Sequence, residues 1–348
     1  MNFMFAQLNN IEIPEGRFDI IPSDTLENIE VYLASPSCLL KYKNELMTDI
    51  VSQSSIFSDL GKYDTVALLR KPMICVWSET EEKELKFENK EMADKYYSRK
   101  GILYSDLVSI FTIGLWLVKD CSVYSNLYYW CNTDTGYSVK ARRGFQRMNG
   151  QGKMSVVSFS KEEIELALNY MVPILEIMFS EKNINEEVEI IYSQETMVMN
   201  IESAVKNRGD SFSRIFILLQ LARKTGLIFE KISWYCALLE CFFAIERDHK
   251  KNISEMTAGF ISNDKQEQNT ILRDMRLAYK IRSEFVHGNV ISVFNDNVQI
   301  RYLSGKVDEY VRKTLRKAIS DNNFNYTNTA KDVKRVREYL AKEIKKFE

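Results

Sequence analysis

Residues 232–248 form the stretch that decides the fold of this chain, ISWYCALLECFFAIERD. Apolar side chains recur in it at intervals of three and four residues, which predicts a helix over residues 231–251. The positions on this apolar stripe are Trp234, Leu238, Leu239, Phe242, Phe243 and Ile245. A stripe this broad needs other helices to cover it, so we expect this part of the chain to be a helical bundle.

The segments on both sides of this stretch have the same helical periodicity. They predict four further helices, over residues 201–225, 267–287, 306–319 and 330–347. Gly226 and Gly288 follow two of these segments, as glycines often do at helix C-termini. We therefore predict an all-helical domain over residues 196–348.

The first half of the chain mixes strand and helix patterns. β-branched and aromatic runs predict strands over residues 29–33, 64–76 and 123–130, with Pro72 interrupting the second one or placing it at a sheet edge. An apolar helix is expected over residues 104–120. Another helix starts after Ser160, which has Glu163 at the spacing of a capping box. The predicted fold is therefore mainly α, with an α+β domain over residues 1–195 before the all-α domain.

Composition limits the classes of function open to the chain. The 348 residues have a formal net charge of -1, so any contact with nucleic acid must come from a local basic patch. Two histidines, and cysteines without a Cys-x-x-Cys pair, argue against a metal site, and we expect no cofactor. The start has no secretory signal, and the longest apolar run, residues 107–118, is too short to cross a bilayer. We expect a cytoplasmic protein with reduced thiols and no membrane contact.

Residues 279–289, YKIRSEFVHGN, carry the side chains best suited to chemistry. His287 ends the third predicted helix, and Arg282 lies about 7.5 Å earlier along the helix axis. An imidazole can move the proton of a ribose 2′-hydroxyl, while arginine stays charged and can hold the phosphate. The end of a helix favours the imidazolium form, which suits a general acid. Together these residues suit RNA cleavage without a metal.

Several of these side chains also have a purely structural interpretation. His287 could hydrogen-bond the last carbonyls of its own helix, and the Ser283 hydroxyl could bond back to the carbonyl four residues earlier. Glu240 and Glu246, on the preceding helix, are candidates to orient Arg282. At least one of these two glutamates is expected to be solvated at the surface.

Residues 140–153, KARRGFQRMNGQGK, are basic and contain no acid. Arg142 and Arg143 could contact RNA phosphates there, with Phe145 stacking on a base. The alternative is a solvated basic loop or hairpin without a role in binding. His249, in the charged run RDHKK, is expected on the surface.

The segment from Arg282 to His287 resembles the Arg-x4-6-His motif of the HEPN superfamily, in particular its ApeA-like group. In that group a stretch like RSEFVHG ends the third helix of an all-helical domain. Residues 232–248 look like the preceding helix of the family, and the resemblance covers roughly residues 200–348. It implies that Arg282 and His287 are the catalytic pair and that Ser283 is the variable polar residue after the arginine. It also implies a homodimer in which two such motifs face each other and form one metal-independent ribonuclease site.

The function expected from this resemblance is an endoribonuclease that leaves 2′,3′-cyclic phosphate and 5′-hydroxyl ends. Many members are toxins or effectors of abortive anti-phage defence, so an antitoxin or another defence protein is an expected partner besides RNA. Residues 1–195 would then sense a trigger and release the nuclease. Some members are non-catalytic, and the alternative is a nucleotide-binding, RNA-binding or dimerisation module that acts with a partner protein.

Overall fold

A computed structural model of the chain describes residues 2–21, 29–36, 70–78, 90–132, 138–142, 146–178, 211–243, 248–292, 296–320, 338, 340 and 342. The chain divides into two compact units, and neither is continuous in sequence. The first contains Met1–Gln146 and Ser155–Met171, and the second contains Arg147–Met154 and Val172–Glu348. The boundary predicted at residue 195 lies outside the described residues.

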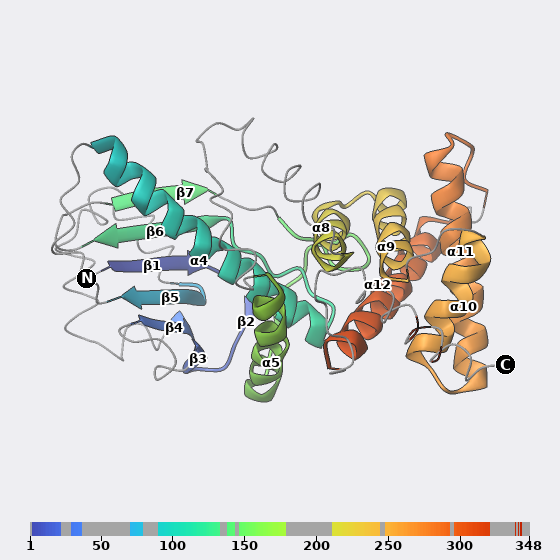
Figure 1. Cartoon of the computed structure of the whole chain (residues 1–348), viewed down its shortest axis with the longest axis horizontal. Coiled ribbons are helices and arrows are strands. Elements are labelled where there is room, and N and C mark those ends of the chain that lie inside the picture. Colours follow the sequence, from blue (N-terminus) through green and yellow to red (C-terminus); the bar gives the residue numbers. More distant parts are fainter. Residues whose placement is uncertain are drawn as a thin grey trace. The chain divides into compact units, whose positions relative to one another are not determined.

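The first unit contains a six-stranded antiparallel sheet with the strand order β3-β4-β5-β1-β6-β7 (Figure 1). Its strands are β1 (Asn2–Gln7), β3 (Arg17–Ile21), β4 (Ile29–Ala34), β5 (Met73–Ser78), β6 (Leu127–Asn132) and β7 (Ser138–Arg142). A short parallel pair joins β2 (Ile11–Glu12) to β8 (Val157–Ser158). The consecutive residues Met4, Phe5 and Ala6 of β1 are all buried, so both faces of this central strand are covered.

The strands agree with the sequence predictions in part. The segments predicted over residues 29–33 and 123–130 correspond to β4 and to β6. Residues 64–69 lie outside the described part, and β5 begins directly after Pro72, which has no N–H for a strand ladder. The expected edge position is wrong, because β5 pairs with β4 on one side and β1 on the other.

Helix α4 (Lys90–Val118) crosses one face of the sheet (Figure 1) and contains the apolar helix predicted over residues 104–120. Phe111, Leu115 and Trp116 are completely buried. Gly114 permits a close approach to α5 (Lys161–Met178), because a Cβ at this position would lie 2.4 Å from the carbonyl oxygen of Ala167. None of the described helices has the length and apolarity that crossing a membrane requires.

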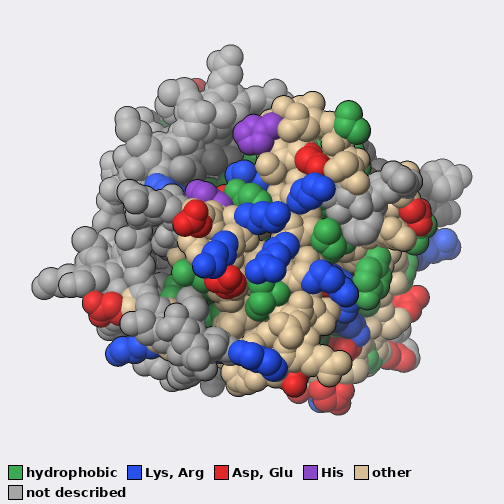
Figure 2. All heavy atoms as spheres, turned by 90° about the vertical axis from the view of Figure 1, so that its right-hand side faces the viewer, with side chains coloured by type: hydrophobic (Ala, Val, Ile, Leu, Met, Phe, Trp, Pro, Cys, Tyr) green, Lys and Arg blue, Asp and Glu red, His purple; other side chains and the backbone are tan. Residues whose placement is uncertain are grey.

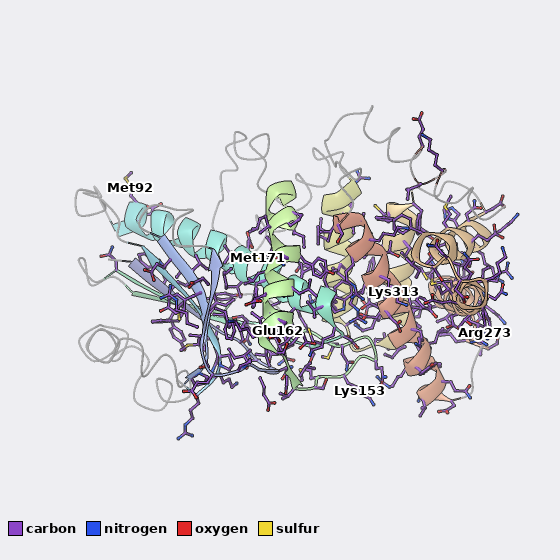
Figure 3. The ribbon with its side chains drawn as sticks, turned by 90° about the horizontal axis from the view of Figure 1, so that it is seen from below. Met92, Lys153, Glu162, Met171, Arg273 and Lys313 are labelled. Carbon is purple, nitrogen blue, oxygen red and sulfur yellow. The ribbon has the colours of Figure 1, made fainter. Side chains whose placement is uncertain are left out.

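Helix α5 begins with the predicted capping box. The Ser160 hydroxyl accepts a hydrogen bond from the Glu163 N–H at 3.2 Å, and the Glu163 carboxylate accepts one from the Ser160 N–H at 2.9 Å. Two backbone donors at the helix start are thereby satisfied. Pro173 lies inside α5, and Figure 3 shows this helix with Glu162 and Met171 labelled.

Apart from residues 147–154, the described part of the second unit consists of helices and their connections. Its helices are α8 (Ser211–Lys224), α9 (Ile228–Phe242), α10 (His249–Ile261), α11 (Lys265–Val286) and α12 (Asn297–Ser320). Helix α9 lies between α8 and the pair formed by α10 and α11 (Figure 1). The core includes Ile232, Leu239, Met275, Ile281 and Val311, all completely buried. Burying each such side chain stabilises the fold by about 1.5–3 kcal/mol.

Two helix predictions need correction. The single helix predicted over residues 231–251 is two helices, because α9 ends at Phe242 and α10 begins at His249. Asp248 has a φ of 48°, a left-handed conformation that a continuous helix cannot contain. Gly226 does not have the positive φ expected of a glycine that ends a helix.

The remaining helix predictions fall on α8, on α11, on α12 and outside the described residues, with α8 lying inside the helix predicted over residues 201–225. The helix predicted over residues 267–287 corresponds to α11, and the one over residues 306–319 is the later part of α12. Of the last predicted helix, over residues 330–347, only three residues are described, and all three are helical.

Residues 147–154 pack within the second unit, although they lie far from its helices in sequence. The Met148 N–H donates to the carbonyl of Arg223 on α8 at 2.7 Å. The Ser304 hydroxyl of α12 donates to the carbonyl of Gly150 at 2.6 Å. These bonds tie the segment to two helices of the unit.

The packing of this segment corrects the sequence prediction for residues 140–153. A solvated loop was expected, but Arg147 is buried and so is Gly150. A Cβ on Gly150 would lie 2.7 Å from Cβ of Asp308, so only glycine fits this approach without a shift. Half of the predicted basic segment is therefore a packed part of the helical unit.

Candidate active site

The end of α11 holds His287 in a defined turn. His287 is the C-cap residue, and Gly288 after it has a φ of 70°. The Gly288 N–H donates to the carbonyl of Phe285 at 3.3 Å, and the Asn289 N–H donates to the carbonyl of Glu284 at 2.8 Å. This pair of bonds is a Schellman motif. Backbone N–H groups therefore occupy these carbonyls, and the His287 imidazole is not needed to cap them.

Side chains on both sides of the turn anchor it. The Glu284 carboxylate accepts hydrogen bonds from the Ser292 N–H at 3.0 Å and the Ser292 hydroxyl at 2.8 Å, which lowers the pKa of Glu284. Phe285 stacks on Phe229 of α9, with 6.3 Å between the ring centroids. His287 itself is exposed. The turn thus presents an imidazole to solvent from a fixed backbone.

The guanidinium of Arg282 lies against α9 and is half-buried. One of its nitrogens, Nη2, is 3.5 Å from Oε2 of Glu240, and the other, Nη1, is 3.5 Å from the Tyr279 hydroxyl. The central carbon of the guanidinium lies 5.3 Å from the centre of the Tyr279 ring. Glu240 and Tyr279 therefore stand where they can orient Arg282.

Glu240 has a second partner, His249, at the start of α10. Its Oε1 lies 3.6 Å from Nδ1 of His249. Both of these atoms are shielded from solvent, although the His249 side chain as a whole is 41% exposed. One carboxylate thus separates the Arg282 guanidinium from an imidazole. His249 is half-buried, not the plain surface residue that the sequence predicts.

Two further titratable groups lie near this carboxylate. Burial raises the pKa of the Cys236 thiol to about 12, so the thiol stays protonated and unreactive near neutral pH. Burial also raises the pKa of the Tyr279 hydroxyl, which stays protonated and can donate a hydrogen bond. Cys236 and Tyr279 therefore both stay protonated near the Glu240 carboxylate and the Arg282 guanidinium.

Arg282 and His287 leave α11 on different sides. Five residues correspond to a rotation of about 140° around the helix axis. Arg282 faces α9, whereas His287 follows Lys280 by seven residues and Arg276 by eleven, so these three side chains share one face. The helix of a single chain therefore does not direct the arginine and His287 to the same point.

The face of α11 that carries His287 is basic. Arg273, Arg276 and Lys280 are exposed along it, and so are Lys250 and Lys251 on the neighbouring α10. Figure 2 shows Lys and Arg side chains gathered on the side of the molecule where α10 and α11 lie, with histidine side chains nearby. Figure 3 shows Arg273 at the outer edge of the helices.

Arg273 of this basic face pairs with Asp274 at 3.1 Å, whereas the acidic partners of Arg276 and Lys280 are more distant. Nη2 of Arg276 is 3.9 Å from Oε1 of Glu255, and Nζ of Lys280 is 3.7 Å from Oε1 of Glu284. Exposed pairs of this kind contribute about 0–1 kcal/mol, so a phosphate can replace them. The face is therefore able to accept a polyanion.

The other predicted site residues add little to this cluster. The hydroxyl of Ser283 has no hydrogen bond to any residue that the structure describes, so the predicted bond to the carbonyl four residues earlier is not formed. Glu246 and Arg143 lie outside the described residues. Arg142 ends β7 in the first unit, and its contribution to RNA binding stays a prediction.

Tyr279 and His249 are not among the site residues that the sequence predicts. Tyr279 could have been found, because it precedes Arg282 by three residues and such residues are neighbours on a helix. His249 could not be found in this way. The apolar pattern continues through the end of α9, so the break that turns α10 back toward Glu240 was not predicted.

Neither protein-family models, curated proteins nor solved structures give a match to this chain. Within the described ranges, no group of three or more His, Cys, Asp and Glu side chains is arranged to hold a metal ion.

Proposed function

We propose that this chain is a metal-independent endoribonuclease of the HEPN type, active in the cytoplasm as a toxin or effector of abortive anti-phage defence. One observation carries the proposal. The exposed imidazole of His287 stands on a fixed turn at the end of a basic helix face, in a segment that resembles the HEPN motif. A basic face suits the phosphates of RNA, and an exposed imidazole suits proton transfer to a large substrate.

In the proposed reaction the 2′-oxygen of a ribose attacks the adjacent phosphorus, and the 5′-oxygen leaves. The proton of the 2′-hydroxyl must be removed, and the leaving oxygen must receive one. His287 at the C-terminal end of α11 is suited to donate, because its imidazole is exposed to a large substrate and can carry a proton. Arg282 would offset the negative charge that develops on the phosphate oxygens. The products are a 2′,3′-cyclic phosphate and a 5′-hydroxyl.

A second copy of the chain would bring the two motif residues together. In one chain Arg282 and His287 lie about 140° apart around α11. The two side chains can therefore act on one phosphate only if one of them comes from a second copy of the chain. Val286 is 57% exposed and Val290 is 88% exposed on either side of His287. An apolar rim of this kind is suited to contact between proteins, and we propose that it belongs to a homodimer contact. An antitoxin or another defence protein would cover the same end of α11.

The same geometry supports a second candidate function. Because Arg282 is engaged with Glu240 and faces away from His287, the chain could bind RNA on its basic face without cutting it. It would then be a non-catalytic RNA-binding or dimerisation module that acts with a partner protein. Binding that weakens with salt, without new RNA ends, would favour this function.

The experiment that separates the two functions uses the full chain with transfer RNA and messenger RNA. We expect His287→Ala to lower the cleavage rate by about 10²- to 10⁴-fold, because it removes a proton-transfer group. Arg282→Ala should have a comparable effect. Cleavage by the unmodified chain should continue in the presence of a chelator, since the reaction uses no metal.

His249 contacts Glu240, the partner of Arg282, so His249→Ala cannot serve as a control. The control is a substitution at Lys161, an exposed residue of the first unit. Lys161→Ala should cut RNA at the rate of the unmodified chain. Expression of the active chain should arrest growth, and the His287→Ala chain should not. If the His287→Ala chain cuts RNA and arrests growth as before, the assignment of this site is wrong.

A further inference from the structure

We propose that His249 is a second proton-transfer residue of the same site and acts as the general base beside Arg282. This inference rests on the proposed ribonuclease function and adds to it a group that the HEPN motif does not contain. Its basis is the line of contacts from Arg282 through Glu240 to His249, which joins three helices of the second unit.

The contacts place the imidazole close to the guanidinium. Nη2 of Arg282 is 3.5 Å from one oxygen of the Glu240 carboxylate, and Nδ1 of His249 is 3.6 Å from the other. Glu240 is only 15% exposed. The Glu240 carboxylate is thus the group that lies between the Arg282 guanidinium and the His249 ring. His287, in contrast, leaves α11 about 140° away from Arg282.

The carboxylate also selects the useful tautomer of His249. A proton on Nδ1 would point toward Oε1 of Glu240, which lies 3.6 Å away, and both atoms are shielded from water. The lone pair then resides on Nε2, at the other edge of a ring that is partly exposed. The separation of 3.6 Å is just longer than a hydrogen bond, and such contacts commonly shorten when substrate binds.

The backbone before His249 adds an independent observation. Asp248 adopts a left-handed conformation, with φ 48° and ψ 44°, and its side chain makes no capping hydrogen bond to α10. Left-handed residues other than glycine are uncommon. Aspartate is one of the types that adopt this conformation more readily, and such residues cluster at functional sites. This turn starts α10 with His249 as its first residue, next to Glu240 of α9.

The proposed step balances with two imidazoles. Nε2 of neutral His249 takes the proton of the 2′-hydroxyl as the 2′-oxygen bonds to phosphorus. The bond from phosphorus to the 5′-oxygen breaks, and that oxygen takes a proton from the imidazolium of His287 of a second copy. One histidine ends protonated and the other neutral, and exchange of protons with water restores both. Among the residues that the structure describes, the titratable groups that face Glu240 and His249 include Cys236 on α9, and Tyr279 and Arg282 on α11.

The test compares His249→Ala and His287→Ala on two RNA substrates with the same mapped cleavage site. One substrate has the natural 5′-oxygen, and the other has a bridging 5′-sulfur, which leaves without needing a proton. On the natural substrate each variant should be about 10²- to 10⁴-fold slower than the unmodified chain. The sulfur substrate should restore most of the rate of His287→Ala and little of the rate of His249→Ala.

Two further measurements separate proton transfer from a structural role. The rate of His249→Ala should lose its rise with pH through the histidine range, and added imidazole should restore part of its activity. If His249→Ala unfolds, His249→Gln takes its place, because its amide can keep the contact with Glu240 but cannot act as a base.

The results of these experiments distinguish an error in the role of His249 from an error in the proposed function. If the chain cuts RNA, depends on His287 and keeps its rate in His249→Ala, the role of His249 is wrong while the proposed function stands. A slow His249→Ala that the sulfur substrate rescues, or that keeps the pH profile of the unmodified chain, also overturns the role as a base. A chain that cuts no RNA overturns both the inference and the proposed function.

Discussion

At the residue scale, the pair formed by Arg282 and Glu240 controls the positive charge that a phosphate would meet. The two side chains are 26% and 15% exposed and 3.5 Å apart, so water screens their attraction in part. A phosphate can bind a guanidinium through two parallel hydrogen bonds, whereas Glu240 makes a single contact of this kind. We therefore expect Glu240 to hold the guanidinium in place while a phosphate binds its other N–H groups.

Gly288 is the residue that sets the direction of His287. Its φ of 70° disfavours any side chain, although nothing lies within 4 Å of the place where a Cβ would be. We expect Gly288→Ala to lower the free energy of unfolding by about 1 kcal/mol, because alanine is strained in this conformation. Urea denaturation measures this loss. RNA cleavage should also slow, since the turn that carries the imidazole must shift.

Gly288→Asn is the matched control for this prediction. Asparagine adopts the left-handed conformation more readily than alanine, so it should cost less stability and keep more activity. If the two variants lose stability equally, the conformation of residue 288 is not what holds the turn.

At the scale of elements, α11 serves two purposes on opposite faces. Its buried face packs into the unit through Ile271, Met275 and Ala278, and Asp274 accepts a hydrogen bond from the Tyr310 hydroxyl of α12 at 2.8 Å. Burial raises the pKa of Tyr310, so this donor stays protonated. The opposite face is exposed and basic. The helix can therefore lose its exposed charges without losing its packing.

The basic face predicts how RNA binding depends on salt. We expect Arg276→Gln combined with Lys280→Gln to weaken the binding of single-stranded RNA. The slope of the logarithm of affinity against the logarithm of salt concentration should fall by about 1.4, from about 0.7 for each phosphate contact removed. Fluorescence anisotropy with a labelled oligonucleotide measures both quantities.

The control variant combines Arg214→Gln with Lys161→Gln, so it also removes one arginine and one lysine. Both residues are exposed and lie outside α11. Lys161 pairs with Glu165 four residues later at 3.9 Å, much as Lys280 pairs with Glu284 at 3.7 Å. The control should leave the salt slope unchanged. Equal changes in the two double variants would mean that net charge, not the face of α11, attracts the RNA.

At the scale of the whole molecule, the helical unit depends on a segment that precedes it in the chain. Residues 147–154 bond to α8 and α12 through their backbone. Removing residues 1–195 to test the first half as a sensor would therefore also remove part of the helical unit. A silent fragment from that deletion would report lost packing as readily as a lost trigger.

A substitution within the segment tests this dependence in the full chain. We expect Gly150→Ala to lower the free energy of unfolding by about 1–3 kcal/mol, because its Cβ would meet Cβ of Asp308 at 2.7 Å and overpack the site. Thermal unfolding measures the loss. Gly226→Ala is the control, since its Cβ would meet its nearest atom at 3.6 Å, an ordinary contact. If Gly150→Ala is no less stable than Gly226→Ala, the segment does not pack as described.

The sequence by itself determined the elements whose signals are local. The capping box of Ser160 and Glu163, the apolar part of α4 and the end of α11 before Gly288 each depend on residues within a few positions of one another. Neighbouring side chains and backbone groups meet whatever the rest of the chain does, so the pattern suffices to predict them. The exposed His287 at the end of its helix belongs to this class.

Only the tertiary structure decided which distant residues meet. The contact of Glu240 with His249 depends on the left-handed turn at Asp248. Gly150 packs beside α12, although helices α8, α9, α10 and α11 come between them in the sequence. A periodic pattern predicts that one face of a helix is buried, but it does not identify the residues that cover this face. Partners are chosen by the packing of the whole unit, where many weak contacts act together, and no short stretch of sequence contains that information.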